Sequence, residues 1–174
     1  MRSYLLILGE REAVAWVLRH QRMAFPARRR AEAGRLESGD ELLIYTTRGC
    51  WHNPGRDMSR IIGRAYVTSP VKPLEAPVEV AGRTFESGCR IDVRTLTPYL
   101  TGVELAPLVE NLAVFPVKSS WSIRLRRPLL ELPDGDAEML RGHLAEMEAS
   151  ADEVVDGYLQ AIKPVAGQGT APGE

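Results

Sequence analysis

The order of hydrophobic and polar positions divides the chain into short strands and amphipathic helices. Apolar runs at 4–8 and 41–47 predict buried strands. Residues 10–20 repeat apolar side chains at helical spacing, with acids at the start and bases at the end, which predicts a helix. Residues 89–96 alternate apolar and polar positions, as a half-buried strand does.

The remaining pattern adds strands in the middle of the chain and helices at its end. Gly63 indicates a bulge or a close backbone approach within the strand expected at 60–69. Ser150 and Glu153 have the spacing of a capping box. The other predicted elements are a hairpin at 78–86, a strand at 121–133 and helices at 134–148 and 150–162. Five or six short strands with peripheral helices predict a small mixed barrel of the α+β class.

Length and composition are those of a soluble protein with a single domain. The chain has 174 residues, of which 44% are hydrophobic and 26% charged. Its apolar runs are far shorter than the roughly 20 residues that span a bilayer, so we expect no membrane association. Two cysteines are too few for a disulfide framework and favour a cytoplasmic location. We expect 163–174 to be a disordered tail.

Charge is segregated along the chain. Residues 19–127 contain 18 basic and 11 acidic residues, whereas 128–174 contain 2 basic and 10 acidic residues. Most of the basic residues are arginines, whose guanidinium groups suit phosphates and base edges. A genome rich in G and C would also favour arginine, and charge runs are often only solvated surfaces. Nucleic-acid binding requires the basic residues of 19–64 and 121–127 to meet on one face.

Signatures of catalysis or metal binding are missing from the sequence. It contains no glycine-rich phosphate loop, no HExxH and no GxSxG motif. Cys50 and His52 lie two residues apart in a loop, with no obvious third group to orient them as a nucleophile pair. Paired zinc ligands such as CxxC do not occur either. The sequence therefore predicts no enzyme, no metal site and no cofactor.

Three segments together resemble the EVE domain proteins of the PUA-like superfamily, which are related in architecture to YTH domains. They are RHQRMAFPARRRAEAGRLESGDELLIYTT (19–47), RIIGRAYVTSP (60–70) and WSIRLRRPLLELPDGD (121–136). The order and spacing of the segments carry this resemblance, which runs over about 4–147. It implies a PUA-like β-barrel at 1–149, followed by a helical extension at 150–162.

The resemblance also implies a pocket between barrel and helix in which relatives enclose a modified nucleobase within aromatic walls. Relatives usually have Trp where this chain has Leu5, and often Trp where it has Met23, so two walls have become aliphatic or thioether. Trp16 fits a packing role in its helix. The residues expected to bind the base or the nucleic acid are Leu5, Met23, Phe25, Arg28, Arg29, Tyr45, Thr46, Thr47, Trp121 and Ser122.

These observations favour a non-catalytic protein that binds DNA or RNA and recognises a modified or flipped nucleobase. For several residues, structural roles stay open beside this one. Tyr45 and Trp121 are equally compatible with core packing, and Arg28 and Arg29 with a solvated turn. The alternative function is an interaction module whose pocket takes a small ligand or another chain, with the acidic C-terminal helices as the docking surface.

Overall fold

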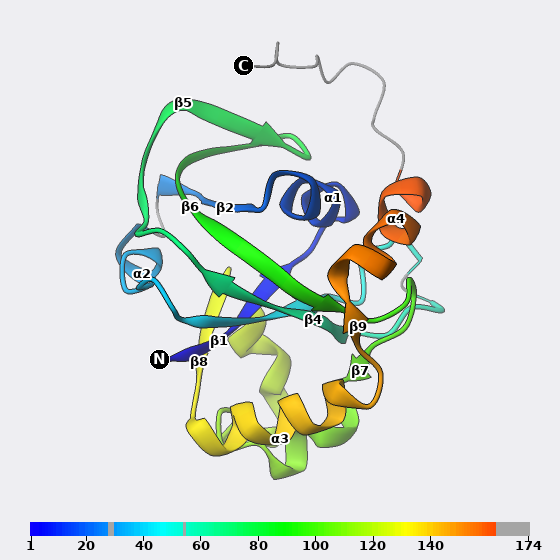
Figure 1. The fold of residues 1–174 in the computed structure, drawn as a ribbon. Coiled ribbons are helices and arrows are strands. Elements are labelled where there is room, and N and C mark those ends of the chain that lie inside the picture. Colours follow the sequence, from blue (N-terminus) through cyan, green and yellow to red (C-terminus); the bar gives the residue numbers. More distant parts are fainter. Residues whose placement is uncertain (28–29, 54, 163–174) are drawn as a thin grey trace.

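Nine β-strands form one mixed sheet in the computed structural model, which describes residues 1–27, 30–53 and 55–162 (Figure 1). The strands β2, β6, β4, β3, β1 and β8 are neighbours in that order, and β5, β7 and β9 pair with β6, β4 and β6. The strands are β1 Ser3–Leu8, β2 Arg22–Phe25, β3 Glu41–Thr46, β4 Arg60–Val67, β5 Lys72–Val80, β6 Arg83–Leu96, β7 Val103–Glu104, β8 Leu129–Leu132 and β9 Ala149–Ser150.

Helices cover both faces of this sheet. Figure 1 shows α1 and α3 on opposite sides of the sheet, with α4 beside its edge. The helices are α1 Arg11–His20, α2 Arg30–Ala33, α3 Asp134–Ala145 and α4 Ala151–Ala161, and the 3₁₀ helices are η2 Ala106–Asn111 and η3 Lys118–Leu125. The arrangement is an α+β half-barrel, which confirms the predicted fold class. In the described part of the chain, no helix is both long and apolar enough to cross a membrane.

The sheet separates two hydrophobic cores. Strands β1 and β3 pair in parallel at its centre and are buried on both faces. Because neighbouring side chains of a strand point to opposite faces, Leu6 joins the core that includes α1, whereas Leu5 and Tyr45 join the core that includes α3. Alternate residues of these strands therefore face the helices on opposite sides of the sheet.

Helix α1 is joined to the sheet by the residue that ends it. Gln21 adopts a left-handed backbone conformation, with φ of 51°, and its side chain donates to the Leu18 carbonyl at 2.9 Å. The same side chain accepts from the Val93 backbone N–H at 2.8 Å. The chain then enters β2, a strand that the sequence pattern did not reveal, and β2 pairs with β6.

Two features predicted around glycines are confirmed. The hairpin between β5 and β6 turns at Ala81 and Gly82, whose φ values of 51° and 75° suit a tight two-residue turn. Gly63 approaches β6 so closely that a Cβ atom there would lie 2.2 Å from the Thr95 carbonyl oxygen. The register of β3 against β4 shifts beside it, between Ile44 and Tyr45.

The strand predicted over 121–133 is wrong for its first half. Residues 118–125 form the 3₁₀ helix η3, and only Leu129–Leu132 pair as a strand. Side-chain donors from η3 reach carbonyls outside it: Lys118 Nζ bonds the Leu112 carbonyl at 2.6 Å, and Arg124 bonds the Val114 carbonyl at 3.0 Å. These hydrogen bonds to carbonyls six and ten residues earlier stabilise a conformation that the apolar alternation does not indicate.

The C-terminal helices differ from the sequence expectation mainly at their caps. Pro133 is the N-cap of α3, and the Asp136 carboxylate accepts from the backbone N–H groups of Ala113 and Val114. Ser150 precedes α4 but makes no capping hydrogen bond, so the expected capping box is not formed. The boundary between 1–149 and 150–162 stays a prediction, and the tail at 163–174 lies outside the described residues.

Candidate functional site

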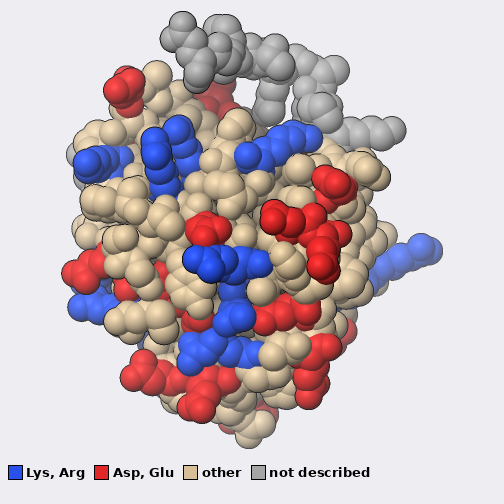
Figure 2. Space-filling model, in the orientation of Figure 1, with Lys and Arg blue, Asp and Glu red and all other residues tan. Residues whose placement is uncertain are grey.

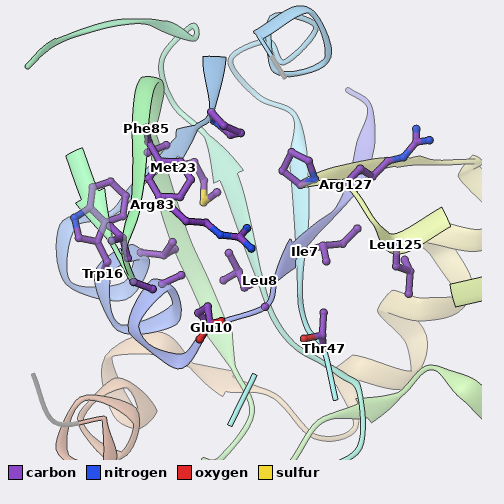
Figure 3. A pocket seen from close by; sticks show the side chains of 18 of the residues that line it. Ile7, Leu8, Glu10, Trp16, Met23, Thr47, Arg83, Phe85, Leu125 and Arg127 are labelled. Atoms are coloured by element: carbon purple, nitrogen blue, oxygen red, sulfur yellow. The ribbon is translucent and has the colours of Figure 1, made fainter. Parts of the chain in front are cut away.

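A pocket of about 400 Å³ opens where α1, the end of β1, β2 and the tip of the β5–β6 hairpin meet. The segment that follows η3, from Leu125 to Pro128, forms the opposite side. Figure 3 shows that Ile7 and Leu125 lie across the pocket from Trp16 and Met23. A volume of about 400 Å³ lies within the roughly 300–1,000 Å³ that is usual for small-molecule sites.

One wall of the pocket is apolar and partly aromatic. Trp16 from α1, Met23 from β2 and Phe85 from β6 lie together on that side (Figure 3). Trp16 and Phe85 are only half-buried, so their rings remain accessible from the pocket. The Trp16 ring also packs against His20, with 5.2 Å between the ring centroids. Such a wall can pack against the flat face of an aromatic ligand.

Arg83 supplies a positive charge beside this wall. It follows the turn at Ala81 and Gly82, and its guanidinium group extends toward the middle of the pocket (Figure 3). Within the described part of the chain, Arg83 forms no ion pair. Arg127, on the other side, is 3.8 Å from a carboxylate oxygen of Glu32. Arg83 is therefore available to a ligand as a hydrogen-bond donor and cation.

Glu10 gives the pocket an acidic group as well. Its carboxylate lies 3.2 Å from His52 Nε2, and both side chains are more than two-fifths exposed. Together with Glu12, these residues bring three potential metal ligands within 4.8 Å of one another. Carboxylates and an imidazole could hold a divalent cation, although exposed groups of this kind commonly stand together without one.

Burial controls the titration of several groups near the site. Burial raises the pKa of the Cys50 thiol to about 12 and that of Cys89 to about 11. Both thiols are consequently protonated at neutral pH and are poor nucleophiles. Burial, together with the positive charges of Arg22 and Arg19, lowers the pKa of His20.

Two of the ten residues expected at the site line the pocket, namely Met23 and Thr47. Four others are fully or almost fully buried and offer no surface to a ligand: Leu5, Phe25, Tyr45 and Thr46. Trp121 and Ser122 belong to η3, where Trp121 packs against Phe115 with 5.6 Å between ring centroids. Arg28 and Arg29 lie outside the described residues.

The structure adds three residues to the site that the sequence did not single out as ligand contacts. Trp16 fitted a packing role in an amphipathic helix, and Arg83 and Phe85 flank an ordinary hairpin turn. The apolar spacing of α1 and the Ala81-Gly82 turn were visible in the sequence. No local signal shows that this hairpin folds over α1, because that packing depends on residues far apart in the chain.

The basic residues do not all gather at the pocket. Figure 2 shows one face of the molecule, on which Lys and Arg side chains alternate with Asp and Glu side chains. Arg64 pairs with Glu148 at 2.9 Å, and Arg141 pairs with Glu41 at 2.6 Å. Arg126 and Arg127 line the pocket, whereas none of the described basic residues of 19–64 does. The expected meeting of these two groups is therefore not found at the pocket.

Comparison with known proteins identifies the fold. No family model matches the chain, and no curated protein matches its sequence. A structural-genomics protein from Pseudomonas putida superposes with a TM-score of 0.55 at 15% identity, covering 80% of this chain and 97% of its own. The YTH domain of the Zygosaccharomyces rouxii MRB1 protein, solved with N6-methyladenosine RNA, gives 0.57 at 12% identity, covering 81% and 84%.

A second YTH domain, that of Pho92 in complex with N6-methyladenosine, matches with a TM-score of 0.58 at 11% identity and covers 82% of each chain. Identities this low show a shared fold alone. The protein therefore has the α+β half-barrel of the YTH domains. The function must be inferred from the residues of its own pocket.

Proposed function

We propose that this protein is an EVE-like, non-catalytic nucleic-acid-binding domain that takes one nucleobase, unpaired or flipped out of a duplex, into the pocket beside Trp16. Two independent lines support the proposal. The sequence resembles EVE domain proteins, and the fold is similar to YTH domains whose solved complexes contain N6-methyladenosine. A base enclosed in this way leaves the stack of neighbouring bases and is recognised by the walls of a pocket.

The single observation that carries the proposal is the combination of an aromatic wall with an unpaired guanidinium. Trp16, Met23 and Phe85 offer apolar surface to the face of a base, and Arg83 reaches toward the same space. Stacking on aromatic side chains and hydrogen bonding by arginine are the usual means of binding unpaired bases. Glu10 and Thr47 add acceptors that can contact the amino groups of a base edge.

The composition of the wall favours a ligand with an added apolar group. The thioether of Met23 adapts to irregular shapes and packs against aromatic rings. Ile7, Leu8 and Leu125 extend the apolar surface across the pocket. A methyl group on a base would remove further apolar area from water here, and each buried methylene-sized group is worth about 0.8 kcal/mol.

Two tryptophan variants test the proposal and separate the observed pocket from the one expected from the sequence. We expect Trp16→Ala to weaken binding of single-stranded oligonucleotides roughly tenfold or more, because base–aromatic stacking is worth about 1–3 kcal/mol. Trp121→Ala should leave affinity unchanged, since Trp121 packs against Phe115 and does not line the pocket. Fluorescence anisotropy measures both, using DNA and RNA strands with methylated and unmodified bases.

A thermal melt must accompany each curve, because both tryptophans also pack against a hydrophobic core. Trp16→Leu is the second pocket variant, since it keeps apolar packing but removes the aromatic face. If Trp121→Ala weakens binding and the folded Trp16 variants do not, the base is held elsewhere. If the wild-type protein binds no oligonucleotide of either kind, the proposed function is wrong.

A further inference from the structure

A second, smaller hollow of about 160 Å³ adjoins the pocket. Trp16 and Met23 line both of them, so the two hollows share one wall. The lining of the smaller hollow includes three cations, Arg22, Lys72 and Arg90, and no acidic residue, whereas the lining of the pocket includes Glu10 beside its three arginines. Its lining also includes Pro70, just before β5, and Pro73, within β5.

The strand register brings these three cations together. Arg22 of β2 lies directly opposite Arg90 of β6. Lys72 of β5 lies opposite Gly88, two residues before Arg90, and therefore on the same face of β6. Like charges that face each other across strands are destabilising. None of the three forms an ion pair within the described residues, so the fold leaves this repulsion uncompensated.

Gly88 is one of the residues that line the hollow, and it presents backbone without a side chain. Gly88 lies between Lys72 and Ala24 in the three adjacent strands. A Cβ atom at this position would come 2.4 Å from the Met23 carbonyl oxygen, so a larger residue could not be accommodated without a shift. The hydroxyl of Ser69 accepts from the Arg90 N–H at 2.8 Å, which joins the start of β5 to β6.

We propose that this hollow binds a phosphate of the nucleic-acid strand, next to the nucleotide whose base enters the pocket. The inference rests on the proposed function and adds a site to it. Two guanidinium groups and one ammonium group suit the oxygens of a phosphodiester, which guanidinium binds in a bidentate manner. A ligand phosphate would also relieve the repulsion between Arg22 and Arg90. The wall shared with the pocket places phosphate and base on adjacent parts of one strand.

The salt dependence of binding tests this site. Each phosphate contact with a single strand contributes about 0.7 to the slope of log K against log salt. We expect the double variant Lys72→Gln/Arg90→Gln to lower the slope for a single-stranded oligonucleotide by roughly 0.7, with the preference among bases unchanged. Arg94→Gln is the matched control, because Arg94 is an exposed arginine of the same strand that pairs with Asp92 and lies outside the hollow. Its slope should equal that of the wild type.

An unchanged slope in the double variant would overturn the proposal. The double variant removes two charges and Arg94→Gln removes one, so a fall in Arg94→Gln of half or more of that in the double variant would indicate a general effect of charge and would overturn it too. A second arm is independent of the base pocket: inorganic pyrophosphate is titrated while backbone amide resonances are followed by NMR. We expect shifts at residues 22, 72 and 90 and none at 94. The same shifts produced by an acidic peptide and not by pyrophosphate would assign the hollow to a protein partner. Pyrophosphate binding without base preference would uphold this site and contradict the proposed base pocket.

Discussion

At the scale of single residues, the side of the sheet on which a side chain lies determines what it can contact. Leu5 and Tyr45 sit in strands that are apolar at almost every position, because β1 and β3 are buried on both faces. A continuous apolar run predicts burial but does not indicate which face each residue joins. For this reason both residues were predicted to contact a ligand, whereas in the structure they pack into the core that includes α3.

The pKa of His20 reports on the positive charge of Arg22, which lines the second hollow. Burial and the charges of Arg22 and Arg19 lower its pKa from the ordinary value of 6.5. The folded state therefore takes up a proton less readily than the unfolded state, and this group reduces stability as the pH falls below about 6.5. We expect Arg22→Gln to raise the pKa of His20, as measured by an NMR titration of its ring protons.

The control for this titration is Arg94→Gln, which removes the same charge from a residue that does not act on His20. It should leave the titration of His20 as it is in the wild type. A pKa of His20 that is identical in all three proteins would show that Arg22 does not lie close to the imidazole. The charge arrangement that we describe around the second hollow would then be incorrect.

At the scale of elements, α4 belongs to the packing of the barrel. The ring of Tyr158 is fully buried and lies 5.4 Å from the Tyr99 ring and 6.2 Å from the Trp51 ring, measured between centroids. Its hydroxyl donates to the Thr97 carbonyl at 2.7 Å. These contacts place α4 against the barrel.

Removing the Tyr158 side chain should therefore destabilise the whole fold. We expect Tyr158→Ala to lower the free energy of unfolding by about 3–5 kcal/mol, the usual cost of truncating a large aromatic residue in a core. Tyr158→Phe should cost about 1 kcal/mol, because it removes only a hydrogen bond. Chemical denaturation measures both, with the exposed Gln160→Ala as control. A Tyr158→Ala protein as stable as the control would mean that α4 is dispensable to the core.

Element prediction succeeded where a segment's own pattern determines its structure. The helix at 10–20, the hairpin at 78–86 and the strand at 60–69 were all visible because spacing and turn residues agree locally. The prediction for 121–125 was wrong because the alternation of Trp121, Ile123 and Leu125 with polar residues is typical of a strand. The side chains of Lys118 and Arg124 instead donate to carbonyls six and ten residues earlier, outside the alternating segment, and stabilise 118–125 as a 3₁₀ helix.

At the scale of the whole molecule, the pocket is assembled from segments that are distant in sequence. Met23 and Thr47 could be predicted because they belong to segments that resemble the family. Trp16, Arg83 and Phe85 reach the site through the packing of the β5–β6 hairpin near α1 (Figure 1). Basic and acidic residues that are segregated along the sequence also form ion pairs with one another in the folded protein. Glu148 of the acidic segment 128–174 pairs with Arg64 of the basic segment 19–127. Conversely, Arg141 of the acidic segment pairs with Glu41 of the basic segment.

In the proposed complex, one base of a bound strand leaves the stack of its neighbours and enters the pocket beside Trp16. The most direct test is the affinity of the wild-type protein for one single-stranded oligonucleotide and for the same strand with an abasic nucleotide at each position in turn. We expect one position at which loss of the base weakens binding about tenfold or more, with the salt dependence unchanged because every phosphate remains. Equal affinity for the intact strand and for every abasic strand would contradict it.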